Sequence, residues 1–179
     1  MRPDTAISAQ NNEVVVTFLN LLLADEYVLY TKTRTAHWNV DGENNFELHV
    51  LLENQYNKLD EIIDAIAIRI RSLGHFALGS LKNFLSISQM IDDNGNLNNS
   101  GQTFEILLHD HEAIIRVIHH EMDPISHQLK DADTADFLTE ILGQHQKIVW
   151  MLKSFLSEPD FDITAHIRAI STQFIDIQD

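Results

Sequence analysis

The chain has 179 residues, 44% of them hydrophobic, which is enough to bury one core and fits a single domain. It contains no cysteine, which excludes disulfides, thiolate metal sites and cysteine nucleophiles and leaves His, Asp and Glu as the strong metal ligands. Asp and Glu number 27 against 12 Lys and Arg, and the net charge of -15 opposes binding to nucleic-acid phosphates and anionic membranes. Cations are therefore the expected soluble partners.

Two long helices are predicted in the first half of the chain, because apolar residues recur there at steps of three and four. The first is expected from about 12 to 35, and the second from about 46 to 72. The Asp-Gly pair at 41–42 predicts a turn between them.

Two further long helices are predicted in the second half. The third is expected from about 103, with Pro124 ending, kinking or restarting it, and the fourth from about 133 to 156. The apolar stretch 81–84 predicts a small helix in a long crossover between the second and third helices. Four long helices with such a crossover describe an all-α, ferritin-like four-helix bundle.

The expected domain is single and spans 1–179, with a helical core at about 12–156 between tails of 1–11 and 157–179. The first tail has one basic residue and no apolar core, so it does not look like a signal peptide. A membrane span needs about twenty consecutive apolar residues, and no stretch of the chain approaches that length. The expected location is the cytoplasm.

A stripe of metal-ligand side chains lies beside the apolar face of the second predicted helix. At 100° per residue, Glu53, Asp60 and Asp64 fall within about 40° of one another, and acids alone would simply indicate a solvated face. His49 lies within about 60° of Asp64 and one turn from Glu53, so His49 and Glu53 can bind one ion. Asp64, however, is about 16 Å from Glu53 along the axis. Two copies packed antiparallel across a two-fold axis near 57–58 would bring the first pair opposite Asp64 of the other chain.

Short motifs occur in a fixed order over roughly 12 to 156. They are His37-Trp38-Asn39-Val40, Gly42, Phe46, Leu48-His49, Glu53, Tyr56, Asp64, Arg69, Leu73-Gly74, Leu81-Lys82, Phe84-Leu85, Asp110-His111-Glu112, Asp133-Thr134-Ala135-Asp136-Phe137, Lys147 and Trp150-Met151-Leu152. This set resembles the signature of the Dps family, the mini-ferritins called DNA-binding proteins from starved cells. The spacing from His37 to His49 to Asp64 matches that signature without a gap.

The resemblance implies a dodecameric shell that oxidises Fe(II), preferably with hydrogen peroxide, stores the ferric mineral and protects against oxidative damage. A pair of iron ions, or fewer, would sit at each of the two identical sites of a two-fold interface between subunits, and a mixed nitrogen and oxygen ligand set suits iron. Trp38 and Tyr56 are expected near the site as core aromatics. The resemblance maps the ferroxidase ligands, which are both catalytic and metal-binding, onto His37, His49, Glu53 and Asp64.

One position departs from the family pattern. The family usually has a glutamate ligand one turn after Asp64, immediately before Arg69, and this chain has Ile68, which cannot bind a metal. Three explanations stay open: the site binds iron weakly, a histidine such as His75 substitutes, or the site has decayed. The two candidate functions are therefore a ferroxidase, weakened or altered, and a storage or structural shell with little oxidation.

Three acids near the start of the fourth helix resemble those that line iron-entry pores at the family's three-fold axes. They are Asp131, Asp133 and Asp136, and three copies of each would concentrate negative charge and attract Fe(II). Capping of the fourth helix by Asp133 is the structural alternative, and both roles can coexist.

Histidines also cluster on the third helix and beyond, where exposed helix residues are the simplest expectation and a secondary metal site is weakly specified. They are His109, His111, His119, His120 and His127. DNA binding is not expected, because the family's DNA binders commonly use a lysine-rich arm. Here the N-terminal tail lacks lysine, and the last residues include Asp176 and Asp179.

Overall fold

The computed structural model describes residues 7–40, 45–91 and 100–156, and within these ranges the regular structure is entirely helical. The all-α prediction is thereby confirmed. The predicted 41–42 turn and the 157–179 tail lie outside the described residues. The elements are α1 (Ala9–Asn39), α2 (Asn45–Ser72), α3 (Leu81–Ile87), α4 (Ser100–Asp123), the π-helical turn η1 (Pro124–Gln128) and α5 (Ala132–Leu156).

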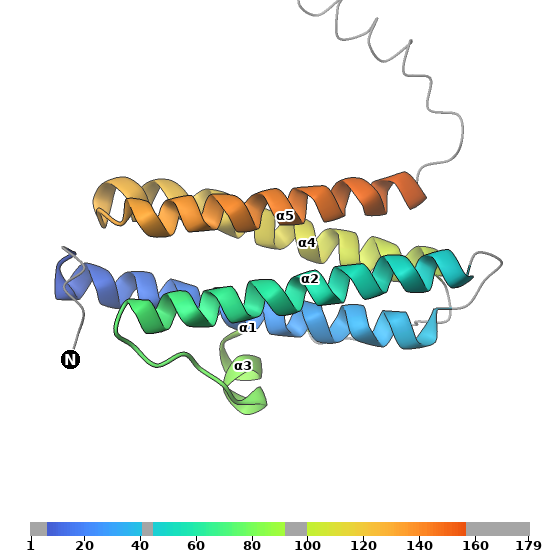
Figure 1. Ribbon diagram of the computed structural model, residues 1–179, viewed down its shortest axis with the longest axis horizontal. Coiled ribbons are helices and arrows are strands. Elements are labelled where there is room, and N and C mark those ends of the chain that lie inside the picture. The colour runs from blue at the N-terminus through green and yellow to red at the C-terminus, as the bar shows by residue number, and fades with distance from the viewer. Residues whose placement is uncertain (1–6, 41–44, 92–99, 157–179) are drawn as a thin grey trace, which may run out of the picture.

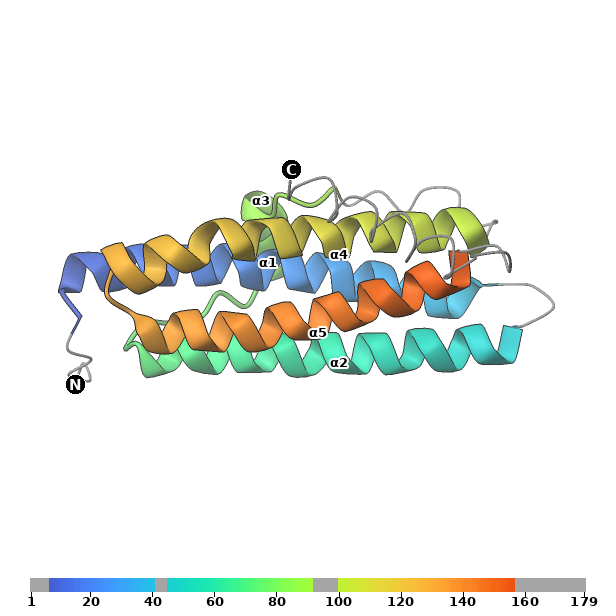
Figure 2. The ribbon, with the colours of Figure 1, turned by 90° about the horizontal axis from the view of Figure 1, so that it is seen from above.

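The four long helices form a bundle of two antiparallel pairs, with α1 against α2 and α4 against α5 (Figure 1). Seen from above, α4 lies over α1 and α5 lies over α2 (Figure 2). Helices α2 and α4 run in the same direction (Figure 2). Between them in sequence, α3 packs beside α1. This is the predicted ferritin-like arrangement.

Apolar stripes from all four long helices meet in one core. Each fully buried Leu or Ile contributes about 1.5–3 kcal/mol relative to an exposed position, so the stripes hold the bundle together. The largest fully buried side chains are Leu19, Leu22, Leu23, Leu29, Leu52, Leu59, Ile62, Ile66, Ile70, Leu107, Ile114 and Ile118.

Helix α1 is longer and more apolar than the sequence analysis predicted. By length and composition alone it could cross a membrane, although the core helix of a soluble bundle passes the same test. Of its most apolar 18-residue window, 56% is buried inside the bundle. That burial, together with Asp25 and Glu26 inside the helix, fits a core helix.

Local signals set the ends of the first two helices. Ser8 caps α1 because its hydroxyl accepts the Asn11 N–H at 3.2 Å, so the helix starts before the predicted residue 12. It then continues through the motif that begins at His37, four residues past the predicted end. At the end of α2, Gly74 has a φ of 87°, which glycine adopts without strain.

The described part of the crossover is fixed to α1 by partly buried polar contacts. Asp25 Oδ1 accepts the Ser88 hydroxyl and the Gln89 N–H, both at 2.7 Å. Asn20 Oδ1 accepts the Leu78 N–H at 3.0 Å. Burial raises the pKa of Asp25, although the hydrogen bonds from Ser88 and Gln89 act in the opposite direction. The path of α3 is therefore determined by side chains of α1.

Pro124 does not stop the third long helix. The chain continues as η1, in which the Leu129 N–H donates to the Pro124 carbonyl at 2.9 Å. The wider π turn accommodates a proline that has no N–H to donate. Lys130 then adopts a φ of 60°, and this left-handed residue turns the chain into α5.

Candidate metal centre

The end of α1 and the start of α2 bring two predicted ligands together. His37 and His49 are half-buried, and their Nδ1 atoms lie 3.4 Å apart with the rings at 90°. Two nitrogens at this separation can each lie about 2.0–2.1 Å from one ion at a near-tetrahedral angle. The antiparallel α1–α2 pair therefore places two imidazole nitrogens of one chain where a single ion can contact both. His37 Nδ1 also lies 3.2 Å from the His49 carbonyl oxygen.

Glu53 follows His49 by one turn on α2 and is exposed. The Tyr56 hydroxyl donates to Glu53 Oε1 at 3.4 Å, and the Tyr56 ring lies 5.4 Å from the His37 ring. Tyr56 is thus beside the predicted site, as expected. The carboxylate therefore lies one helical turn from His49 and is exposed, with Oε1 bonded to Tyr56.

Asp64 is exposed on the same helix, but helix geometry separates it from Glu53 by about 16 Å. Among the described residues, no group of three or more His, Asp or Glu side chains is placed to hold a metal ion. One chain therefore brings His37 and His49 together and leaves Asp64 apart from them.

An arginine that the sequence analysis missed lies beside the histidines. The Arg34 guanidinium carbon lies 5.6 Å from the Tyr30 ring centroid, 5.4 Å from Trp38 and 4.9 Å from Tyr56. A hydrogen bond to the Tyr30 hydroxyl, at 2.6 Å, raises the pKa of Arg34. The spacing of Tyr30, Arg34 and Trp38 at four-residue steps was the available signal. Trp38 is 64% exposed, so the expectation that it is a core aromatic was wrong.

Exposed apolar side chains share the ligand face of α2. Phe46 is 81% exposed and Ile68 is 59% exposed. At 100° per residue both lie within about 40° of Asp64, as does the exposed Val50. Ile68 thus occupies the ligand stripe one turn beyond Asp64, and the stripe combines acids with apolar groups that water solvates poorly.

Asp131 is not free to line a pore. It is 2% exposed, its Oδ1 accepts the Thr134 N–H at 2.9 Å, and its Oδ2 accepts the Thr134 hydroxyl at 2.6 Å. Arg69 Nη2 also donates to Oδ1 at 3.1 Å. Asp131, rather than Asp133, therefore caps α5, because the cap precedes the first helical residue. Asp133 and Asp136 remain exposed.

The expectation for the histidine cluster was wrong for His111. It is fully buried, because it lies on the apolar stripe of α4 between Leu107 and Ile114. Its exposed companions are His109, His119, His120 and His127.

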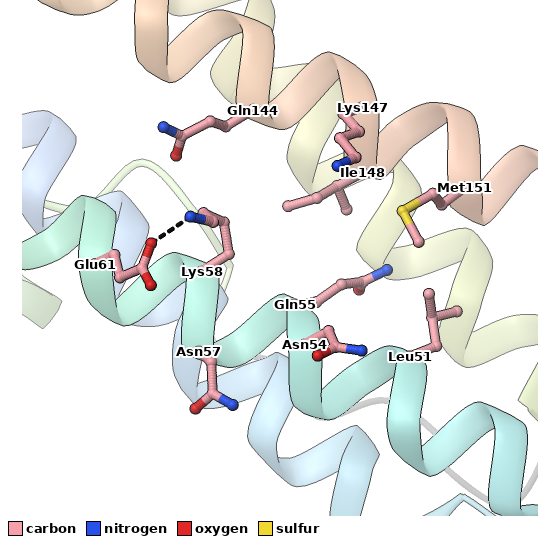
Figure 3. Close-up of a pocket in the computed structure, with 10 residues that line it drawn as sticks. All are labelled: Leu51, Asn54, Gln55, Asn57, Lys58, Glu61, Gln144, Lys147, Ile148 and Met151. Carbon is pink, nitrogen blue, oxygen red and sulfur yellow. Dashed lines mark hydrogen bonds and ion pairs between the residues drawn. The ribbon is translucent and has the colours of Figure 1, made fainter.

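A groove of about 570 Å³ separates α2 from α5 (Figure 3). Gln55 is buried there, and neither of its amide atoms has a hydrogen-bond partner. The carboxylate among the residues that line the groove is Glu61, and it pairs with Lys58. The groove therefore offers no cluster of carboxylates or imidazoles for iron.

Comparison with known proteins agrees with the fold and with the family resemblance. A ferritin-like domain model matches residues 16–160. The chain is 37% identical over 155 residues to an uncharacterized low temperature-induced protein of Nostoc sp., covering 87% of each chain. It is 32% identical over 147 residues to DNA protection during starvation protein 2 of Bacillus anthracis, covering 82% of this chain and 99% of the relative. The crystal structure of a Dps protein from Vibrio cholerae O1, described as a ferritin-like diiron-carboxylate protein, superposes with a TM-score of 0.80 at 25% identity, covering 88% and 98%. The chain therefore belongs to the ferritin-like superfamily and, within it, to the Dps family of mini-ferritins.

Proposed function

We propose that this Dps-family protein stores iron in a homo-oligomeric shell and oxidises Fe(II) at sites shared by two chains. The observation that carries the proposal is the His37–His49 pair, whose Nδ1 atoms lie 3.4 Å apart next to an exposed stripe of acids. An iron-storage role is what the family supports. The shared site, the oxidant and the dodecamer are the finer parts of the proposal.

A two-fold axis near 57–58 of α2 completes the site. In an antiparallel pair of α2 helices around this axis, Asp64 of the second copy comes level with residue 51, between His49 and Glu53 of the first. The same operation brings Ile68 of the second copy within about one residue's rise of Phe46. Both side chains are exposed in the single chain, and the second copy would cover them.

The ligand set suits oxidation of Fe(II) by peroxide. His37 and His49 would hold the ferrous ion through neutral nitrogens, while Glu53 and the second copy's Asp64 favour the ferric product. Two Fe(II) ions give one electron each to hydrogen peroxide. Its O–O bond breaks, and with two protons it forms two water molecules beside two Fe(III) ions. Transfer of both electrons at one site avoids release of hydroxyl radical.

The surface charge fits the supply of Fe(II) to a cytoplasmic shell. A net charge of -15 on each chain attracts cations. Asp133 and Asp136 are the exposed acids that we assign to a three-fold pore, without the partnered Asp131. The same charge opposes DNA, so DNA binding is not part of the proposal.

A shell with little oxidation is the second candidate, and Ile68 is the observation that favours it. The usual glutamate is missing from the ligand stripe, so the second copy supplies Asp64 without a second carboxylate. His75, which is half-buried just beyond the end of α2, is the histidine that could substitute. The ferroxidase and the storage shell differ in how strongly they bind Fe(II) and in how fast they oxidise it. Two steps of one experiment separate these two properties.

Anaerobic titration with Fe(II), followed by peroxide, tests the proposal. Wild-type protein should bind Fe(II) saturably and oxidise it when peroxide is added. His49→Ala should weaken binding by at least about tenfold, because it removes one nitrogen ligand. His119→Ala, an exposed histidine on α4, is the matched control and should bind as the wild type does. Saturable binding without peroxide-driven oxidation would favour the storage shell. Equal binding by wild type and His49→Ala would contradict the assigned site.

A further inference from the structure

Three titratable side chains meet in the centre of the bundle, away from the iron site. Glu26 of α1, His111 of α4 and His145 of α5 are each fully buried. His145 Nε2 lies 2.8 Å from Glu26 Oε1, and His145 Nδ1 lies 2.8 Å from His111 Nδ1. The three groups thus form a linear chain across three helices.

The row of Glu26, His145 and His111 is not arranged to chelate a metal. His145 directs one nitrogen to Glu26 and the other to His111, so the three groups do not converge on one point. No described cluster of three or more His, Asp or Glu side chains is placed to hold a metal. Its geometry is that of a hydrogen-bond relay, and the ligand that such a relay binds is a proton.

The number of N–H groups shows why an added proton is costly. A neutral imidazole has one N–H and one bare nitrogen. His111 Nε2 is buried and has no hydrogen-bond partner in the structure, and the same is true of Glu26 Oε2. A protonated His111 would therefore carry an N–H without an acceptor, next to a second imidazole and inside an apolar core.

The other buried charges around the relay are already partnered. On α1, Asp25 accepts hydrogen bonds from Ser88 and Gln89, and Lys32 pairs with Asp110 of α4. The core-facing residues of α2 are uncharged leucines and isoleucines with Gln55, and His145 is the buried titratable group of α5. Among the described residues, no further carboxylate is buried beside His111 to neutralise its charge.

We propose that the Glu26–His145–His111 relay is a proton-sensing site that makes the bundle sensitive to acid. The relay is stable while His111 is neutral, and protonation of His111 favours opening of the core between α1, α4 and α5. The proposal does not depend on iron chemistry, because none of the three residues belongs to the assigned ligand set.

The direction of the effect follows from the burial of His111. Burial, with the charge of His145 as the smaller cause, holds the pKa of His111 well below its ordinary range. The unfolded chain therefore binds more protons at this group than the folded chain does. The stabilisation is complete above about pH 6.5 and is lost as the pH falls toward the folded-state pKa.

Unfolding by urea between pH 7.5 and 5.0, at one fixed subunit concentration, tests this with His111→Asn. Asparagine places an amide near the bonded Nδ1 position but does not titrate. Below about pH 6.5, the unfolding constant of the wild type should rise by up to about tenfold per pH unit from this one group. His111→Asn should lack that component, and the exposed control His119→Asn should keep it.

A second measurement on the wild type covers the case in which His111→Asn does not fold. Hydrogen–deuterium exchange at the histidine Cε1 positions, read by mass spectrometry, reports the protonation of each histidine. His111 should stay neutral at pH 5.5, about one unit below the ordinary pKa of a histidine. Parallel pH profiles for wild type and His111→Asn, or a His111 that is protonated at pH 5.5, would overturn the proposal.

Discussion

Ile68→Glu should tighten Fe(II) binding by at least about tenfold and should speed oxidation by peroxide. The substitution adds a carboxylate one turn beyond Asp64, on a position that is 59% exposed and shares the ligand stripe. At the two-fold interface this carboxylate would join Asp64 opposite His49 of the other chain. Anaerobic titration gives the affinity, and stopped-flow mixing with peroxide gives the rate.

Ile68→Gln is the matched control, because it has a similar size and polarity but no charge. Its binding should stay close to that of the wild type. If Ile68→Glu binds no better than Ile68→Gln in an intact shell, the account of the missing ligand is wrong. In that case loss of binding in His75→Ala would identify the histidine as the existing substitute.

Asp131→Ala should lower the free energy of unfolding by about 2–4 kcal/mol. It removes the cap of α5 and leaves the Arg69 guanidinium, which donates to Asp131 Oδ1 at 3.1 Å, without this partner. The expected loss of unfolding free energy is smaller than for a fully buried ion pair, because Arg69 is only partly buried. Urea unfolding at one subunit concentration measures the change.

Asp133→Ala is the control for this prediction, because Asp133 is exposed in the first turn of the same helix. It should change the free energy of unfolding by less than about 0.5 kcal/mol. Asp131→Asn should lie between wild type and Asp131→Ala, since an amide oxygen still caps the helix but carries no charge. A loss below about 0.5 kcal/mol in Asp131→Ala would contradict the assigned cap.

Helix periodicity was sufficient to predict the bundle, because each long helix buries one stripe of leucine and isoleucine. The helix ends were less predictable. The start of α1 depends on the Ser8 cap, and its end at Asn39 lies four residues beyond the predicted residue 35. For α5, Asp131 and Asp133 are both acceptable caps by residue type, and the contact with Arg69 of another helix favours Asp131. Such tertiary contacts are not visible in a local pattern.

The candidate site was predictable where it lies on one helix and less so where helices meet. The distance along α2 showed that Asp64 needs a second copy. The contact between His37 and His49 depends on the pairing of α1 with α2, which the family motif order implied. The burial of His111 was missed, although it falls on the stripe formed by Leu107 and Ile114. Because histidine is polar, an exposed position was expected, although the helical period alone assigns residue 111 to the core.

Co-assembly of two inactive variants tests the shared site most directly. His49→Ala and Asp64→Ala chains should each bind Fe(II) poorly when assembled alone. In a mixed two-fold dimer, one interface site carries both substitutions, and the other combines an intact His49 with an intact Asp64. Native mass spectrometry identifies the mixed dimers, and anaerobic Fe(II) titration measures their sites. Saturable binding should return at one site per mixed dimer. Mixed dimers that recover no binding would contradict a site built from two chains.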